Sequence, residues 1–313
     1  MLGRVADQLY WMARYSERAE NMARMLDVAD RMTLTPQSPE TRDSAWFSAL
    51  EVAGAQEGYA EKHGEIAGKS VLHFMALDSE NPASIYSSIL SARENARALR
   101  GSITTEVFEA INATWLELRS MDAAVLQPSE RRVFFDWVKE RSHLFRGVAD
   151  GTMLRDEAMK FMAIGLDIER ADNTARLLDS KYHILLPSIE EVGGALDYYQ
   201  WGALLRSLSA FRAYHKIYRD RIVSLKVAEL IILHAEMPRS MRCSYDRLMA
   251  NLADLCGDDA PECERLAGRI HSLLKFRRID EIFRGGLHEF LTEFIEGNAE
   301  VGQQIARDFM MVR

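Results

Sequence analysis

Apolar residues recur every three or four positions along most of this 313-residue chain, which is the period of an amphipathic helix. Alternation of apolar and polar residues over five or more positions, as in a half-buried strand, is hard to find. The seven prolines are too few to divide the sequence into short helices. The pattern therefore predicts an all-α protein, a helical bundle of about 10–12 helices.

Start and stop signals place the ends of these helices. In Asn81-Pro82, for example, an N-cap residue precedes a proline at the expected first helical position. We expect helices over residues 3–32, 41–53, 64–77, 82–100, 104–125, 129–149, 155–184, 188–209, 219–235, 239–255, 261–275 and 286–310.

One eleven-residue string occurs twice. Residues 17–27 read E-R-A-E-N-M-A-R-M-L-D, and residues 169–179 read E-R-A-D-N-T-A-R-L-L-D. Eight of the eleven positions are identical, whereas residue frequencies of about 5–10% predict roughly one identity by chance. The string therefore indicates an internal repeat.

Weaker matches continue the repeat in the same order, with offsets of 155 and 156 residues. They pair Trp46, Leu50, Tyr59, Ser84, Ser88, Asn95 and Leu99 with Trp201, Leu205, Tyr214, Ser240, Ser244, Asn251 and Leu255. A duplicated helical unit would produce this order. We predict a first helical repeat over residues 1–150 and a second over 151–313, packed as one globular unit in a pseudo-twofold relation.

The repeated string carries polar and charged residues on one face of each predicted helix, opposite an apolar face. A related string, Arg93-Glu94-Asn95-Ala96-Arg97, lies between the two copies. The candidate binding residues are Glu17, Arg18, Glu20, Asn21 and Arg24 in the first copy, Arg93, Glu94, Asn95 and Arg97 in the middle string, and Glu169, Arg170, Asp172, Asn173 and Arg176 in the second copy.

Two interpretations of this charged face stay open. It is either a solvated surface with pairs such as Glu20–Arg24, each contributing about 0.2–0.5 kcal/mol, or a buried network in which carboxylates accept hydrogen bonds from arginines. A solvated face needs charge but not particular residue types, so the recurring identities favour the network. Arg18 and Arg170 are then expected to pair with carboxylates inside the protein.

The two halves differ in the middle string. Its counterpart, residues 249–253, keeps Asn251 and has no charged residue. We therefore expect a ligand site lined by Arg93, Glu94 and Arg97 rather than two symmetric pockets. The charged strings together are expected to line one cavity or interface that receives a peptide-like or carboxylate-bearing group, and the alternative is an internal salt-bridge lattice with no ligand.

Charge and apolar run lengths bear on compartment and partners. The chain has 39 Lys and Arg against 47 Asp and Glu, a net charge of -8, and a pI near 5.6, which disfavours a duplex-wrapping nucleic-acid binder and a polybasic membrane anchor. No apolar run has the length of a signal peptide or a membrane span. We expect a cytoplasmic protein with no nucleic-acid and no membrane partner.

Signatures of common chemistries are missing from the sequence. It contains no G-x-G-x-x-G, Walker A, G-x-S-x-G or C-x-x-C string. A dimetal carboxylate bundle needs two Glu-x-x-His pairs, and we find one on a predicted helix, Glu140 to His143. The sequence therefore predicts no metal and no cofactor, and it leaves the catalytic residues unknown.

Five separated strings together resemble the bacterial alpha-E domain family from the first residue to near the last. Besides the second copy of the repeat, they are L-Y-W-M-A-R-Y-S-E-R-A-E-N at 9–21, N-P-A-S-I at 81–85, A-R-E-N-A-R at 92–97 and T-M-L-R-D-E at 152–157. The family's ER motif matches Glu17-Arg18 and Glu169-Arg170. The resemblance implies an all-helical cytoplasmic domain.

The resemblance also implies partners. Members are encoded beside or fused to circularly permuted ATP-grasp proteins, with transglutaminase-like and proteasome-like hydrolase proteins as other associates. ATP-grasp enzymes join a carboxylate to an amine through an acyl phosphate. The implied function is a non-catalytic partner or substrate-presenting subunit of an amide or peptide ligase system in peptide synthesis, modification or tagging. The alternative is a stand-alone enzyme that uses Glu17 or Glu169 as an acid or base on a peptide-like substrate.

Overall fold

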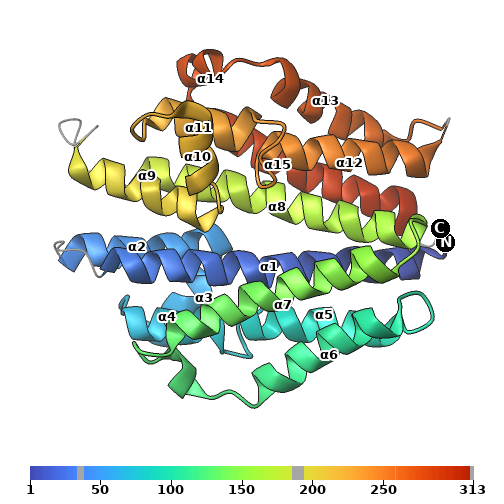
Figure 1. The fold of residues 1–313 in the computed structure, drawn as a ribbon, viewed down its shortest axis with the longest axis horizontal. Coiled ribbons are helices and arrows are strands. Elements are labelled where there is room, and N and C mark those ends of the chain that lie inside the picture. The colour runs from blue at the N-terminus through green and yellow to red at the C-terminus, as the bar shows by residue number, and fades with distance from the viewer. Residues whose placement is uncertain (34–38, 185–193, 258, 311–313) are drawn as a thin grey trace. The chain divides into compact units, whose positions relative to one another are not determined.

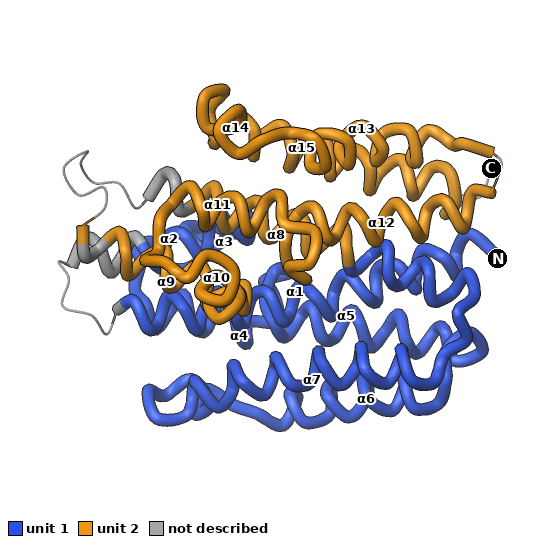
Figure 2. Tube along the Cα trace, turned by 45° about the horizontal axis from the view of Figure 1, so that its top comes forward, with its two compact units in different colours: residues 1–166 blue, residues 167–313 orange. Residues whose placement is uncertain are grey.

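Helices make up nearly all of the regular structure in this computed structural model, which describes residues 1–33, 39–184, 194–257 and 259–310 (Figure 1). Within these ranges there are fifteen α-helices and no strand, which confirms the all-α prediction. The chain divides into two units, Met1–Leu166 and Asp167–Arg313 (Figure 2). The division falls inside a helix, sixteen residues after the end of the predicted first repeat at residue 150.

Unit 1 is built around a bundle of four helices. Its elements are α1 (Gly3–Thr33), α2 (Pro39–Ala53), α3 (Gln56–His63), α4 (Gly68–Ala76), α5 (Ile85–Ala98), α6 (Thr105–Arg119), the 3-10 turn η1 (Ala123–Leu126), α7 (Arg131–Thr152) and the first turns of α8 (Glu157–Ile184). α1 packs against α5 and α7, and α6 packs against the same two helices, so the four run side by side (Figure 1). Leu9, Met12 and Leu26 of α1 have exposed fractions of 0%.

Unit 2 contains the rest of α8 and seven further α-helices. These are α9 (Ala195–Ser207), α10 (Phe211–Tyr218), α11 (Ser224–Leu233), α12 (Met241–Cys256), α13 (Glu262–Phe276), α14 (Ile279–Gly285) and α15 (Leu287–Ile305), which continues into the π-helical turn η3 (Ala306–Met310). α13 packs against α12 and α15, while α11 packs against α12 and α14. α8 joins α12 through a hydrogen bond from the Thr174 hydroxyl to the Arg239 carbonyl, 3.0 Å long.

The prediction of about 10–12 helices was wrong, because the sequence pattern missed three short ones. α3, α10 and α14 have eight, eight and seven residues. Two turns are too few to establish an apolar period, which needs a window of about 11–18 residues. The predicted start of the helix at 188–209 lies partly outside the described residues, and within them α9 begins at Ala195.

The start of α5 also differs from the prediction. The helix begins at Ile85 rather than at residue 82, because the Ser84 hydroxyl accepts the Ser87 N–H at 3.0 Å and caps the first turn. The Asn81 side chain instead forms hydrogen bonds within the turn that precedes α5. It donates to the Phe74 carbonyl at 2.9 Å and accepts the Ala83 N–H at 3.0 Å.

Several positions of the predicted repeat make the same contacts in both units. Tyr59 and Tyr214 are buried, and each hydroxyl donates to one backbone carbonyl and accepts one backbone N–H of the segment that follows. Ser84 and Ser240 cap α5 and α12 in the same way. These contacts support the predicted duplication, which a superposition of residues 4–100 on 156–255 tests, and the pseudo-twofold relation stays a prediction.

Candidate functional site

Two acidic residues of the repeated string lie one turn apart on α1 and are completely buried. Glu17 and Glu20 each have an exposed fraction of 0%. Arg146 of α7 reaches both carboxylates through one nitrogen, Nη1, which lies 2.9 Å from Glu17 Oε2 and 2.5 Å from Glu20 Oε2. Burying a carboxylate is costly unless an opposite charge and hydrogen bonds compensate it. Arg146 therefore compensates the negative charges of both buried carboxylates.

Glu20 has partners at both of its oxygens. Its Oε1 accepts from Nε of Arg24, one turn later on α1, at 2.8 Å, and lies 3.4 Å from Nε2 of His143 on α7. The Arg24 side chain is 11% exposed, whereas the His143 side chain is 55% exposed. We call Glu17, Glu20, Arg24, His143 and Arg146 the carboxylate cluster. The two carboxylates of the cluster have no exposed surface, and His143 is its most exposed side chain.

A serine holds Arg146 in this position. Arg146 Nη1 donates to the Ser142 hydroxyl at 2.9 Å, and that hydroxyl lies 3.5 Å from the Ser16 carbonyl on α1. Ser142 and Arg146 are four residues apart on α7, so their side chains share one face of the helix. The sequence analysis missed Ser142 and Arg146. The available signal was their spacing along the buried stripe of α7, next to Phe145.

The polar face of α1 meets α7 again nearer to its C-terminus. Asp27 Oδ2 lies 3.2 Å from Lys139 Nζ of α7, and Asp27 Oδ1 lies 2.8 Å from Arg31 Nε. Burial alone would raise the pKa of Asp27. The hydrogen bonds and charges of Arg31 and Lys139 outweigh that effect and hold the pKa below its ordinary value. Asp30 of α1 also pairs with Arg131 of α7, with Oδ2 2.9 Å from Nε, so ion pairs join α1 to α7 at three levels.

Two other candidates of the first copy lie close to this face. Arg18 is half-buried, and its guanidinium lies 5.5 Å from the centre of the Tyr15 ring. Asn21 is buried, with 3% of its surface exposed. The pairing of Arg18 and of Arg170 with carboxylates stays a prediction.

The middle string lies on a different side of the bundle. Arg93 donates through Nε to the Asn112 side chain of α6 at 3.2 Å and also pairs with Glu94, which lies 3.6 Å from Arg97. The side chains of Glu94 and Arg97 are 48% and 63% exposed, and Asn95 is half-buried. The described contacts of Arg93, Glu94 and Arg97 run to each other and to α6. The structure therefore does not bring them to the carboxylate cluster.

The second copy of the string lies on α8. Glu169 and Arg170 are buried, with exposed fractions of 6% and 8%. Asp172 pairs with Arg176 at 2.7 Å, and both side chains, like that of Asn173, are partly exposed. Arg146 of α7 has no arginine counterpart in unit 2, because Gly302 occupies the position 156 residues after it.

A separate ion pair of unit 2 joins α8 to α12. Asp167 is 2% exposed and takes two nitrogens of Arg247, with Nε at 2.9 Å. Burial lowers the pKa of Arg247, but the charge and hydrogen bonds of Asp167 outweigh it and hold that pKa above its ordinary value. Arg247 also donates to the sulfur of Cys243, 3.2 Å away. The sequence analysis did not select this pair.

Asp179, the last acidic residue of the second copy, forms an ion pair with His288. Asp179 Oδ1 lies 2.7 Å from His288 Nδ1 of α15, and this hydrogen bond holds the pKa of His288 above its ordinary value of 6.5. A raised folded-state pKa means that the pair stabilises the protein below about pH 6.5 and that this contribution is lost as the pH rises through the folded-state pKa.

In an NMR titration we expect a His288 midpoint above 6.5 that moves toward 6.5 in Asp179→Asn. Asp172→Asn is the control and should leave the midpoint unchanged, and an unaltered midpoint in Asp179→Asn would contradict the pair.

Metal ligands are not grouped in the part of the chain that the structure describes. No three His, Cys, Asp or Glu side chains there are placed to hold one ion. Cys243, Cys256 and Cys263 are free thiols. In the same residues, no helix has both the length and the apolar character needed to cross a lipid bilayer.

Comparison with known proteins identifies the family. Residues 1–310 match Alpha-E, which is described as a predicted alpha-helical domain with a conserved ER motif. This chain belongs to the Alpha-E family. Its two E-R-A strings put an ER pair on α1 and another on α8, and the glutamate of each pair is buried.

Similar sequences occur in mycobacteria. Uncharacterized proteins of Mycobacterium bovis and of two strains of Mycobacterium tuberculosis are each 27% identical over 326 residues, an alignment that covers 94% of this chain and 35% of the relative. The chain thus spans about a third of the length of these curated relatives. No solved structure matches the chain.

Proposed function

We propose that this Alpha-E chain is a non-catalytic partner or substrate-presenting subunit of an ATP-grasp-type amide or peptide ligase system in the cytoplasm. The observation that carries the proposal is the burial of Glu17 and Glu20 beneath their arginine partners. A general acid or base must come within about 2.6–3.2 Å of the proton that it transfers. Carboxylates with no exposed surface do not offer this contact, so the first ER string serves the fold rather than a reaction.

The length of the relatives supports a partner role. The alignment covers 94% of this chain but 35% of each mycobacterial relative, so those proteins carry a large further segment. A fused circularly permuted ATP-grasp enzyme would account for such a segment. It would also supply the nucleotide-binding site for which this sequence has no motif. A transglutaminase-like protein is a second proposed partner.

Reconstitution with the cognate circularly permuted ATP-grasp protein tests the proposal. With ATP, a peptide and an amine, we expect ADP release and amide formation when both proteins are present, and at least tenfold less with either protein alone. Glu20→Gln, assayed well below its unfolding temperature, should keep at least half of the rate, since its carboxylate faces Arg24 and Arg146 rather than a substrate. The rate is measured by coupled ADP release, and the product by mass spectrometry. An ATP-grasp protein that works equally well without this chain would contradict the proposal.

A second candidate function is a stand-alone enzyme that uses the carboxylate cluster for acid-base chemistry on a peptide-like substrate. His143 favours it, because this half-exposed imidazole lies 3.4 Å from the buried Glu20 carboxylate and connects it to solvent. In that case the chain alone would convert a peptide substrate, and both Glu20→Gln and His143→Ala would abolish turnover. Glu20→Gln, which the partner role tolerates, therefore separates the two functions.

A further inference from the structure

Unit 2 contains a groove at the corner where α14 meets α15. Its volume is about 480 Å³, which lies within the range of about 300–1,000 Å³ that is usual for ligand sites. Gly286 joins the two helices with a φ of +97°, a backbone conformation that favours glycine. A Cβ added to the neighbouring Gly285 would have no atom within 4 Å. The two glycines therefore leave the groove open at this corner.

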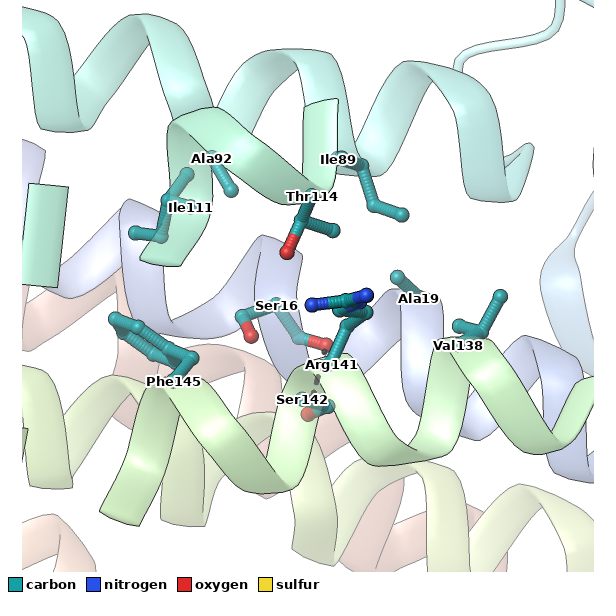
Figure 3. Close-up of a pocket in the computed structure, with 10 residues that line it drawn as sticks. All are labelled: Ser16, Ala19, Ile89, Ala92, Ile111, Thr114, Val138, Arg141, Ser142 and Phe145. Carbon is teal, nitrogen blue, oxygen red and sulfur yellow. Dashed lines mark hydrogen bonds between the residues drawn. The ribbon is translucent and has the colours of Figure 1, made fainter. Parts of the chain in front are cut away.

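The hollow next to the carboxylate cluster of unit 1 is far smaller. It lies between α1, α5, α6 and α7, with Arg141 and Ser142 in its wall (Figure 3). Its volume of about 30 Å³ has room for about two water molecules. The groove of unit 2 is therefore the better candidate for a ligand, and its lining residues all lie in one unit, between Arg277 and Glu296.

Three glutamates of α15 form a row along the groove. Glu289, Glu293 and Glu296 are exposed and line it, and none of them forms an ion pair in the part of the chain that the structure describes. Residues three and four apart share one face of a helix, and like charges at these spacings destabilise it. A row of carboxylates that repel one another favours a positively charged partner across the groove.

The positive groups of the groove do not compensate this row. His288 contacts Asp179 instead, with Nδ1 2.7 Å from Oδ1. Arg277 lies over the Phe290 ring, with its guanidinium carbon 5.7 Å from the ring centre, and forms no ion pair among the described residues. Phe290 and Ile282 are the buried apolar residues of the lining. The contact between Arg277 and Phe290 indicates that this wall suits a guanidinium.

The spacing of the glutamates matches that of an extended peptide. Residues four apart on a helix, such as Glu289 and Glu293, lie about 6 Å apart along the helix axis. In an extended chain, side chains two residues apart point to the same side and lie about 6.6 Å apart. An extended peptide laid along α15 would therefore place alternate side chains opposite these carboxylates. Arginine and lysine also have apolar stems, which would cover the apolar lining of the groove.

We propose that this groove binds an extended segment of another protein in which every second residue is basic. Two basic side chains of the segment pair with Glu289 and Glu293, and Glu296 adds to the attraction. Arg277 is a competitor within the chain, since it covers the Phe290 ring that an incoming arginine would contact. The inference is independent of the proposed ligase role, because it rests on one groove of unit 2.

Titration of a fluorescently labelled Ala-Arg-Ala-Arg-Ala peptide with the full chain, followed by anisotropy, tests the groove. We expect saturable binding that Glu293→Gln weakens about threefold, which is the effect of losing one exposed ion pair. Glu300→Gln is the matched control and should leave the Kd unchanged, because Glu300 is an exposed glutamate of α15 outside the groove. Arg277→Ala should tighten binding about twofold, since it removes the competing guanidinium.

A second peptide of the same composition, Ala-Arg-Arg-Ala-Ala, tests the alternation. It should bind about threefold more weakly, because adjacent side chains of an extended chain point to opposite sides. The proposal is overturned if the alternating peptide shows no saturable binding, or if the two peptides bind equally, which would reduce the groove to an unspecific cation site. Equal weakening by Glu293→Gln and Glu300→Gln would also overturn it, since the attraction would then come from the negative charge of the whole chain.

Discussion

Replacing Arg146 by alanine is expected to lower the free energy of unfolding by about 3–5 kcal/mol. The substitution removes the guanidinium that contacts both Glu17 and Glu20, whose exposed fractions are 0%. The loss should exceed that of an ordinary hydrogen bond, because each carboxylate keeps its burial penalty when a compensating charge is removed. Urea unfolding followed by circular dichroism measures the change.

Arg93→Ala is a matched control, which distinguishes the loss of a charge beside a buried partner from the loss of a charge beside an exposed one. The side chain of Arg93 is 23% exposed, close to the 24% of Arg146, but its carboxylate partner Glu94 is 48% exposed. Arg93→Ala should therefore cost only about 0–1 kcal/mol. Adding Glu20→Gln to Arg146→Ala should restore part of the lost stability, since it removes one buried charge. A loss below about 1 kcal/mol for Arg146→Ala would contradict the interpretation of the cluster as a buried network.

Replacing Gly165 by alanine is expected to destabilise the protein by about 1–3 kcal/mol or more. Gly165 is buried on α8, and a Cβ built there would lie 2.3 Å from the backbone carbonyl oxygen of Tyr10 on α1. Because that atom belongs to a helix backbone, the contact is relieved only if the helices shift apart. Thermal unfolding of Gly165→Ala should show the loss as a lower Tm.

Gly147 provides the opposite case. It lies on the exposed side of α7, with no atom within 4 Å of an added Cβ. Gly147→Ala should stabilise the protein by about 0.5–1 kcal/mol, because alanine loses less conformational entropy than glycine in a helix. If the two alanine variants unfolded at the same temperature, the close approach of α8 to α1 would be wrong.

Local periodicity made the long helices predictable. α1 and α8 were expected over 3–32 and 155–184 and occupy Gly3–Thr33 and Glu157–Ile184. An amphipathic pattern of many turns is written within the segment itself, so it does not depend on distant residues. Helix starts were less predictable, because neighbouring side chains compete for the same cap, as Asn81 and Ser84 do before α5.

The candidate site was predictable only in part. The identities that recur in the second copy, such as Glu17 as Glu169, indicated a network rather than a solvated face, and the structure places Glu17 in one together with Glu20. The partner was not predictable. Arg146 lies 129 residues from Glu17, and it is one of 39 Lys and Arg residues in the chain.

The sequence by itself determined which segments form long helices and which of their faces are polar, because both follow from spacing over a few turns. The tertiary structure decided which polar face is buried. Arg93 and Glu94 resemble the ER string in composition, yet the Glu94 side chain is 48% exposed, because Ala92 and Ala96 are the residues that α5 buries in the bundle. A charged helix face becomes a buried network only where a second helix brings a partner to it, and that pairing depends on packing between distant segments.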